Sequence, residues 1–305
     1  MKVSDYQKGA AETDRVADNA SPAWAPIAFG LNGQVGALND LLRRRVRDSH
    51  SFTAFKDEAK RELGSVFWYA TTLATRLNLD LEEILVANLK QASERWGKGP
   101  EGPPEQNRGT GSKFFDASEP HDKQLPRKLT VEFRCEEKVQ AADLLPRVKI
   151  LVDGVQRGDT IDDNAHKPDG YRFHDTQHLA FAAHLGWSPV IRALLGCKRK
   201  DHLDGGEVDR VEDGARARDT EEAIVRIIHA WASRFNYFIG VQGVDTELLN
   251  IIKSITRGLE VECRHPLQWE QAIISAYRLR KEVMEGRGGF VTADLDAQTL
   301  TYHRP

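Results

Sequence analysis

The segment from Arg61 to Tyr69 lies within the most regular apolar pattern of the chain. Apolar residues before, through and after it recur in alternating steps of four and three, at Ala59, Leu63, Val66, Ala70, Leu73 and Leu77. This period predicts an α-helix that buries one apolar stripe against neighbouring helices. Glu62 and Ser65 lie one turn apart beside the stripe, where a carboxylate needs a partner such as a cation.

Two further helices are expected around this one. Before it, one predicted helix places Leu31, Val35, Leu38 and Leu42 on one face, and Gln34 and Ala37 are one turn apart on the same helix. After it, Asp80 is followed three residues later by Glu83, which resembles a capping box at a helix start. This third helix is expected to run to Trp96.

These three helices, in this order, resemble the MazG-type all-α nucleoside triphosphate pyrophosphohydrolases over residues 6–96. In that family the first helix carries Glu-x-x-Glu, the second carries Glu-x-x-Asp, and the four acids hold magnesium on the triphosphate. The matching positions of this chain hold Gln34, Ala37, Glu62 and Ser65. The resemblance also places Asn88 and Arg95 near the nucleotide, although Asn88 has the equal alternative of a polar surface residue.

The replaced acids predict an N-terminal site that is dead or strongly impaired. Magnesium prefers several hard oxygen ligands, and the matching positions retain one carboxylate, that of Glu62. Asp40 and Glu58 lie one turn away from the family positions, displaced by about 5 Å along their helices, which is too far for the same ions. The resemblance leaves Glu62 a residual catalytic role with Mg²⁺ or Mn²⁺, and leaves nucleotide contacts to Gln34, Ser65, Asn88 and Arg95.

Residues 97–128 are expected to form a flexible linker. The run from Gly99 to Pro104 is rich in glycine and proline, which disfavours both helix and sheet. The expected organisation is therefore a helical domain over residues 1–96, this linker, and a second domain over residues 129–305.

The second domain is expected to be mostly helical, with a small antiparallel β-sheet. Four segments alternate with a period of two or have the composition of strands, at residues 129–135, 148–152, 289–293 and 299–302. The sequences Tyr-Arg-Phe-His-Asp, Leu-Gly-Trp-Ser-Pro and Glu-Asp-Gly-Ala-Arg resemble the C-terminal domain that follows a MazG-like domain in a bacterial family. Together, the two domains predict a mainly α fold.

A second candidate site lies in this domain. His174 and His178 are four residues apart on one predicted helix, with Asp175 beside them, and Glu221 and Glu222 lie near the start of another. Imidazole and carboxylate ligands together suit manganese, iron, zinc or nickel. The structural alternative is a helix-start network at His174 and Asp175, a satisfied core histidine at His178, and first-turn acids at Glu221 and Glu222.

Composition excludes several classes of protein. The formal charge of −3 over 305 residues does not suggest a nucleic-acid binder, and no apolar run of membrane-spanning length is present. The first residues lack the apolar region of a secretory signal. Cys135, Cys197 and Cys263 match no zinc-site spacing, and we expect reduced thiols in a cytoplasmic protein.

The leading functional hypothesis is a protein that binds or hydrolyses nucleoside triphosphates, cutting between the α- and β-phosphates to give a monophosphate and pyrophosphate. A metal ion would polarise the phosphates and activate the attacking water. The alternative is a non-catalytic nucleotide sensor or partner-binding subunit in a stress or phage-response system. The family resemblance further predicts a homodimer, because these helical units pair to complete their bundle.

Overall fold

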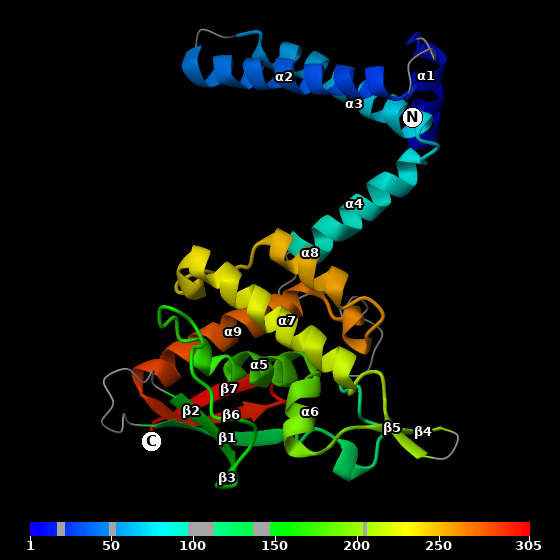
Figure 1. Cartoon of the computed structure of the whole chain (residues 1–305). Coiled ribbons are helices and arrows are strands. Elements are labelled where there is room, and N and C mark those ends of the chain that lie inside the picture. The colour runs from blue at the N-terminus through cyan, green and yellow to red at the C-terminus, as the bar shows by residue number, and fades with distance from the viewer. Residues whose placement is uncertain (17–21, 49–52, 97–112, 137–146, 204–205) are drawn as a thin grey trace. The chain divides into compact units, whose positions relative to one another are not determined.

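The computed structural model describes residues 1–16, 22–48, 53–96, 113–136, 147–203 and 206–305. The chain forms two compact units, residues 1–96 and 97–305 (Figure 1). Helices make up most of the described residues and are accompanied by a small antiparallel sheet, so the predicted mainly α fold is confirmed. The first part of the predicted linker, residues 97–112, lies outside the described residues.

The first unit contains four helices in its described residues: α1 (Val3–Thr13), α2 (Ala25–Asp48), α3 (Phe55–Arg76) and α4 (Leu81–Trp96). The three helices predicted from the sequence correspond to α2, α3 and α4. Asp80 accepts a hydrogen bond from the backbone N–H of Glu83 at 2.9 Å, as expected at the start of α4. Gly30 allows α2 and α3 to pack closely, because a Cβ atom at this position would lie 2.1 Å from a carbon of the Tyr69 ring.

Polar contacts attach α1 to the corner between α3 and α4. The Gln7 side chain donates to the carbonyl oxygen of Leu79 at 3.0 Å and accepts from the backbone N–H of Leu81 at 3.0 Å. Arg76 pairs with Asp14 at 2.7 Å and holds the pKa of that carboxyl below its usual range, through the hydrogen bond that the guanidinium donates. These contacts satisfy backbone groups at helix ends that would otherwise lack a partner.

The predicted apolar stripe of α3 is buried only in part, which corrects the expectation of one fully buried face. Leu63 and Leu77 are each 44% exposed, whereas the buried residues of α3 are Thr71, Thr72 and Ala74. The stripe predicted on α2 is also partly exposed, and its buried residues are Ile27 and Leu41. Within the first unit, α4 contacts α1 and α3 but keeps most of its own apolar side chains exposed, so it leaves one side of α2 and α3 uncovered.

The second unit is built on a five-stranded antiparallel sheet with the order β3-β2-β1-β6-β7. The strands are β1 (Lys128–Glu136), β2 (Arg147–Val152), β3 (Val155–Gln156), β6 (Gly288–Asp294) and β7 (Thr299–His303). The four strands predicted from the sequence are β1, β2, β6 and β7, and β3 was not predicted. Along β1, Leu129, Val131 and Phe133 are buried, whereas the residues between them face outward, as the period of two requires.

Helices and short 3-10 turns complete this unit. The helices are α5 (Asp175–Leu185), α6 (Pro189–Leu195), α7 (Ala215–Ala232), α8 (Thr246–Ile255) and α9 (Pro266–Glu285). The 3-10 turns are η3 (His121–Lys123), η4 (Tyr171–Phe173), η5 (Ser233–Phe238) and η6 (Glu260–Cys263). A separate hairpin, β4 (Lys200–Leu203) and β5 (Gly206–Asp209), was not predicted. Ser188 caps α6 and Pro189 begins it.

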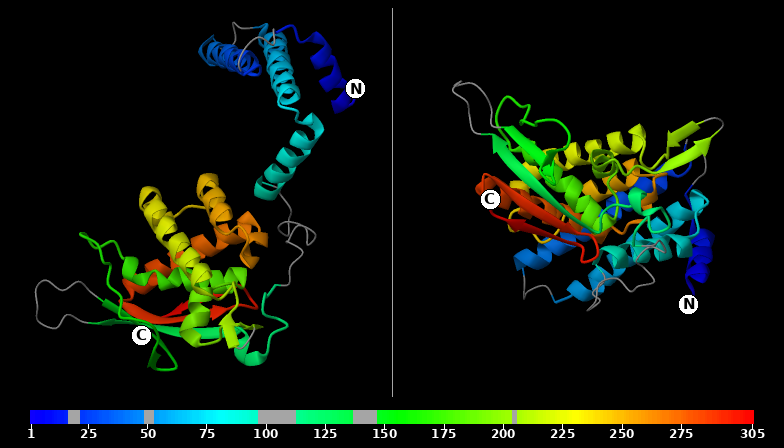
Figure 2. Two further views of the ribbon diagram at one scale, coloured as in Figure 1. Left: turned by 45° about the vertical axis from the view of Figure 1, so that its right-hand side comes forward. Right: turned by 90° about the horizontal axis from the view of Figure 1, so that it is seen from below.

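The second unit has three layers, in which α5 occupies the centre (Figures 1 and 2). One apolar core joins the inner face of the sheet to α5 and α9, through residues such as Phe133, Leu179 and Val283. A second core joins α5 and α9 to α7 and α8, through residues such as Phe181 and Ile224. Almost every residue of α5 is therefore buried, including polar ones, and each of these polar residues needs a partner.

Residues 113–127 pack on the second unit, although the sequence assigned them to the linker. Asp116 is 1% exposed, accepts from the backbone N–H of Leu125 at 2.7 Å, and pairs with both Arg127 and Arg192. Burial alone would raise the pKa of Asp116, but its two arginines and the Leu125 N–H lower it. The expected boundary at residue 128 is therefore too late, because long-range ion pairs hold this segment in place.

No helix among the described residues is long and apolar enough to cross a membrane.

Candidate metal centre

A tight turn places His174 at the start of α5. Asp163 is 3% exposed and accepts hydrogen bonds from the backbone N–H groups of Gly170 and Arg172 and from the Arg172 guanidinium. Gly170 has a φ of 77°, and a Cβ atom there would lie 2.5 Å from a nitrogen of Arg280. Only glycine meets both requirements without strain. The chain then passes through η4 and enters α5 with His174 as the residue before its first turn.

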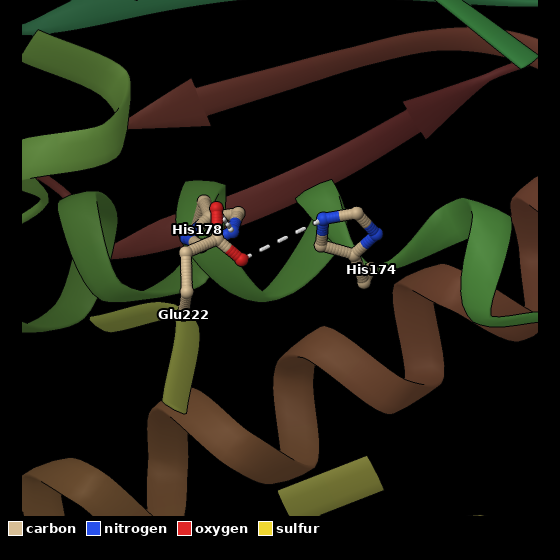
Figure 3. A group of neighbouring side chains, drawn as sticks. All are labelled: His174, His178 and Glu222. Carbon is tan, nitrogen blue, oxygen red and sulfur yellow. Dashed lines mark ion pairs between the residues drawn. The ribbon is translucent and has the colours of Figure 1, made fainter. Parts of the chain in front are cut away.

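His174, His178 and Glu222 meet between α5 and α7 (Figure 3). The two imidazole rings lie one helical turn apart, with their centroids separated by 5.5 Å. One ligand atom from each of the three residues lies within 4.8 Å of the other two. Throughout the part of the chain that the structure describes, no other three residues among histidine, cysteine, aspartate and glutamate form such a group.

The hydrogen bonds of the two histidines fix which nitrogen faces this group. Nδ1 of His174 lies 3.0 Å from the carbonyl oxygen of Tyr171, and Nδ1 of His178 lies 2.7 Å from a carboxylate oxygen of Glu221. Both oxygens only accept hydrogen bonds, so each Nδ1 carries the proton. In the neutral rings, each Nε2 then offers a lone pair on the side of Glu222, which is the arrangement of a metal-binding histidine.

Glu222 completes the group from α7 and opens it to solvent. Its carboxylate oxygens lie 3.6 Å from Nε2 of His178 and 4.0 Å from Nε2 of His174. His178 is fully buried and 12% of the His174 side chain is exposed, but 47% of the Glu222 side chain is exposed. Nε2 of His178 is buried and has no hydrogen-bond partner among the described residues. A buried nitrogen of this kind is costly unless something binds it.

The electrostatics favour a positive charge between the histidines and the carboxylates. Burial by itself would lower the pKa of His178, but the adjacent Glu221 carboxylate and then Glu222 hold it well above its usual value. Burial would likewise raise the pKa of Glu222, but its contact with His178 lowers it. Without a metal, His178 therefore carries a second proton on Nε2, and a divalent cation bound there would displace this proton and supply the positive charge where the two carboxylates converge.

Glu221 positions His178 and is not placed as a ligand. Its side chain is fully buried, and its oxygens accept from Nδ1 of His178 and from the Ser188 hydroxyl at 2.7 Å, and from the Val190 N–H at 2.8 Å. The sequence also allowed Glu221 and Glu222 to be ordinary acids in the first turn of a helix. That alternative is wrong, because α7 begins at Ala215 and its first turn holds no acid.

Asp175 lies apart from the group that the sequence predicted for it. Its side chain is 5% exposed and lines a small apolar cavity on the sheet side of α5, together with Leu179 and Arg157. Helical geometry explains the difference, since residues 174 and 178 share a face from which residue 175 is rotated by about 100°. Asp175 is therefore not part of the candidate metal centre.

The N-terminal candidates make local contacts on their own helices. Glu62 pairs with the neighbouring Arg61 at 3.2 Å, and the Ser65 hydroxyl donates to the Arg61 carbonyl oxygen at 3.3 Å within α3. Gln34 is half-buried on α2 and Asn88 is exposed on α4. The side chain of Arg95 lies outside the described residues.

Three residues at the centre were missed by the sequence prediction. Tyr171 supplies the carbonyl oxygen for His174 and stacks on its ring, with centroids 4.6 Å apart. Burial and the nearby Glu222 raise the pKa of Tyr171 to about 12, so its phenol stays protonated. Arg218 and Arg226 lie four residues before and after Glu222 on α7, and that spacing was the available signal.

Comparison with known proteins gives a family for the second unit. Residues 110–305, which are more than half of the chain, match the family model of the MazG C-terminal domain. The chain belongs to the MazG C-terminal domain family. The match includes the whole candidate metal centre, and the MazG-like resemblance of residues 6–96 stays a prediction.

A relative of the chain occurs in a bacteriophage. Over 75 residues, the chain is 28% identical to the "Gene 37 protein" of Mycobacterium phage L5. This match covers 24% of the MazG C-terminal domain protein described here and 66% of the phage protein, just under two thirds of its length. No solved structure matched the chain.

Proposed function

We propose that this member of the MazG C-terminal domain family binds a divalent transition metal at His174, His178 and Glu222 and acts there on a nucleoside triphosphate. The observation that carries the proposal is the pair of Nδ1 hydrogen bonds, to the Tyr171 carbonyl oxygen and to Glu221, which aims both Nε2 atoms at Glu222. Carboxylate or carbonyl acceptors of this kind usually accompany metal-binding histidines.

The observed distances set how far the side chains must move to hold an ion of this class. Two bonds of about 2.1 Å at a tetrahedral angle separate their ligand atoms by about 3.4 Å. Glu222 faces each histidine with a different oxygen, at 3.6 Å from Nε2 of His178 and 4.0 Å from Nε2 of His174, and the ligand atoms of the group lie within 4.8 Å of one another, so binding would draw them together by up to about 1.4 Å. Two imidazoles and one carboxylate favour manganese, iron, nickel or zinc over magnesium. Three protein ligands leave coordination positions for water and substrate, as in catalytic sites.

The reaction class rests on the family relation and on the N-terminal unit. The family resemblance predicts attack of water on the α-phosphorus, with cleavage of its bond to the oxygen that bridges to the β-phosphate. A metal bound at the centre would supply charge stabilisation on the phosphates. Three of the four acids expected in the N-terminal unit are replaced, so we place the work in the C-terminal unit and leave Glu62 a minor role.

A nucleotide sensor is the second candidate function. The same replaced acids support it, because a chain that has lost a magnesium site can keep nucleotide binding without turnover. The two candidates share metal-dependent nucleotide binding and differ only in whether pyrophosphate is released.

The discriminating experiment measures pyrophosphate release and nucleotide binding with a panel of ribo- and deoxyribonucleoside triphosphates, in Mg²⁺ or Mn²⁺. We expect metal-dependent release that falls about 100-fold or more in Glu222→Gln and changes by less than about tenfold in Glu62→Gln. Binding without release would favour the sensor. A parent protein that neither binds nor hydrolyses any nucleotide contradicts the proposal, and a large loss in Glu62→Gln would assign the chemistry to the N-terminal unit.

We also propose that the chain forms a homodimer through its first unit. Large apolar side chains are exposed on three of its helices, with Phe29 76%, Phe67 60% and Leu89 72% exposed. Apolar exposure on this scale is typical of association surfaces. Sedimentation equilibrium should give twice the mass of one chain, and a monomer at micromolar concentration would contradict this proposal.

A further inference from the structure

Two arginines flank the metal-binding carboxylate on the same side of α7. Arg218 and Arg226 lie one turn before and one turn after Glu222, about 6 Å away along the helix axis in each direction. Glu222 has the spacing for an ion pair with either of them, but its carboxylate turns towards the two histidines instead. Across the described ranges, neither arginine has a carboxylate within 4.0 Å, so both positive charges lack an acidic partner.

Both guanidinium groups lie close to the centre. Nε of Arg218 is buried and has no hydrogen-bond partner among the residues that the structure describes, and this arginine is near enough to help lower the pKa of Glu222. The guanidinium carbon of Arg226 lies 5.9 Å from the centre of the Tyr171 ring, which stacks on His174. The open side of the centre, where Glu222 is exposed, is thus bordered by a cation at each end.

We infer that Arg218 and Arg226 form a two-armed binding site for a polyphosphate chain that spans the metal centre. With a divalent ion in place, positive charge exceeds that of the two carboxylates, and arginine forms paired hydrogen bonds to phosphate oxygens. The two arginines start about 12 Å apart along α7, so a ligand must offer separate anionic groups to contact both. A di- or triphosphate does so, whereas orthophosphate has a single phosphorus centre.

This inference rests on the proposed function and names its substrate-binding residues. It makes Arg218 and Arg226 determinants of specificity for nucleoside di- and triphosphates over monophosphates. It also predicts that inorganic pyrophosphate, which lacks a base and a sugar, is sufficient for binding.

The test is a calorimetric titration of the full-length, metal-loaded chain with inorganic pyrophosphate, and separately with orthophosphate. The metal is kept in excess of both, so that pyrophosphate binds as its metal complex and does not strip the protein. Arg218→Gln and Arg226→Gln are compared with Arg216→Gln, which removes the same charge from an exposed position on a different face of α7. The bound metal of every variant is measured alongside.

We expect pyrophosphate to bind about tenfold or more tightly than orthophosphate, and each of the two flanking variants to weaken pyrophosphate binding by about tenfold or more. Arg216→Gln should stay within about twofold of the parent, and all three variants should retain their metal. Equal binding in parent, Arg218→Gln and Arg226→Gln overturns the inference, as does an equal loss in Arg216→Gln.

Failure of the metal proposal gives a different result. If the parent takes up no metal, pyrophosphate titrations of the metal-free chain still decide the inference. If only Arg218→Gln and Arg226→Gln weaken pyrophosphate binding, the two-armed site exists without the metal. If the metal-free parent does not bind pyrophosphate either, the two-armed site is overturned together with the metal centre.

Discussion

Glu221→Gln tests whether the buried carboxylate behind His178 positions a metal ligand. The substitution keeps the shape of the side chain but replaces one acceptor oxygen with an NH₂ donor. Glu221 accepts three hydrogen bonds, from His178, Ser188 and Val190, at 2.7 to 2.8 Å. In the variant, at least one of these three donors faces another donor, and the remaining bonds lose their charge assistance.

The expected cost follows from those contacts. Losing one charge-assisted bond and leaving one buried donor without an acceptor costs roughly 3 kcal/mol of unfolding free energy. For a unit of this size, that corresponds to a fall in melting temperature of about 6–12 °C. Independently of stability, we expect the affinity for metal to fall about 10- to 100-fold, because Nδ1 of His178 loses the carboxylate that orients its ring.

The assay combines thermal melting of the metal-free proteins with a metal titration at one fixed pH. Glu260→Gln is the matched control, because Glu260 accepts two hydrogen bonds from Arg199 far along the chain from the histidines. It should lower stability without changing metal affinity. If Glu221→Gln binds metal within about twofold of the parent while Glu260→Gln costs similar stability, Glu221 has a structural role only and does not position a metal ligand.

Two further predictions concern other parts of the second unit. Burial, and then the charge of Arg278, lower the pKa of His184 to about 4 from 6.5. The folded state therefore prefers the neutral ring, and its contribution to stability is complete above pH 6.5 and is lost as the pH falls towards 4. Over this pH range, His184 changes the free energy of unfolding by roughly 3 kcal/mol. In denaturant melts, the free energy of unfolding of His184→Gln should therefore depend less on pH than that of the parent, and an equal pH dependence would contradict the assignment. Trypsin should not cleave early after Lys123 or Arg127, because residues 113–127 pack on the second unit. Early cleavage after either residue, detected by mass spectrometry, would show that the linker extends to residue 128.

Local patterns predicted the secondary structure well. The apolar periods located α2 and α3, the capping signal at Asp80 and Glu83 located α4, and alternation located β1 and β2, because these signals depend only on residues close in sequence. The extent of burial on α2 and α3 was not predictable in the same way, since a helical stripe shows which face is apolar but not whether another element covers it. The docking of residues 113–127 depends on Asp116 meeting Arg192, which is 76 residues away.

The candidate site was predicted in its residue types and only partly in its geometry. The spacing of His174 and His178 was sufficient to place both rings on one face of α5. The choice between Glu221 and Glu222 depends on how α7 is rotated against α5. Ile224, Val225 and Ile228 set that rotation by burial, which turns Glu221 inward and leaves Glu222 at the edge.

The most direct test of the central claim is the metal content of the purified chain, measured by elemental analysis after equilibration with Mn²⁺, Ni²⁺ or Zn²⁺ and removal of the free ion. We expect one ion per chain and a matching rise in melting temperature, both lost in His178→Ala and in Glu222→Gln and both retained in Glu62→Gln. A folded parent protein that retains none of the three ions, and whose melting temperature does not change when they are added, would contradict the proposal of a metal centre.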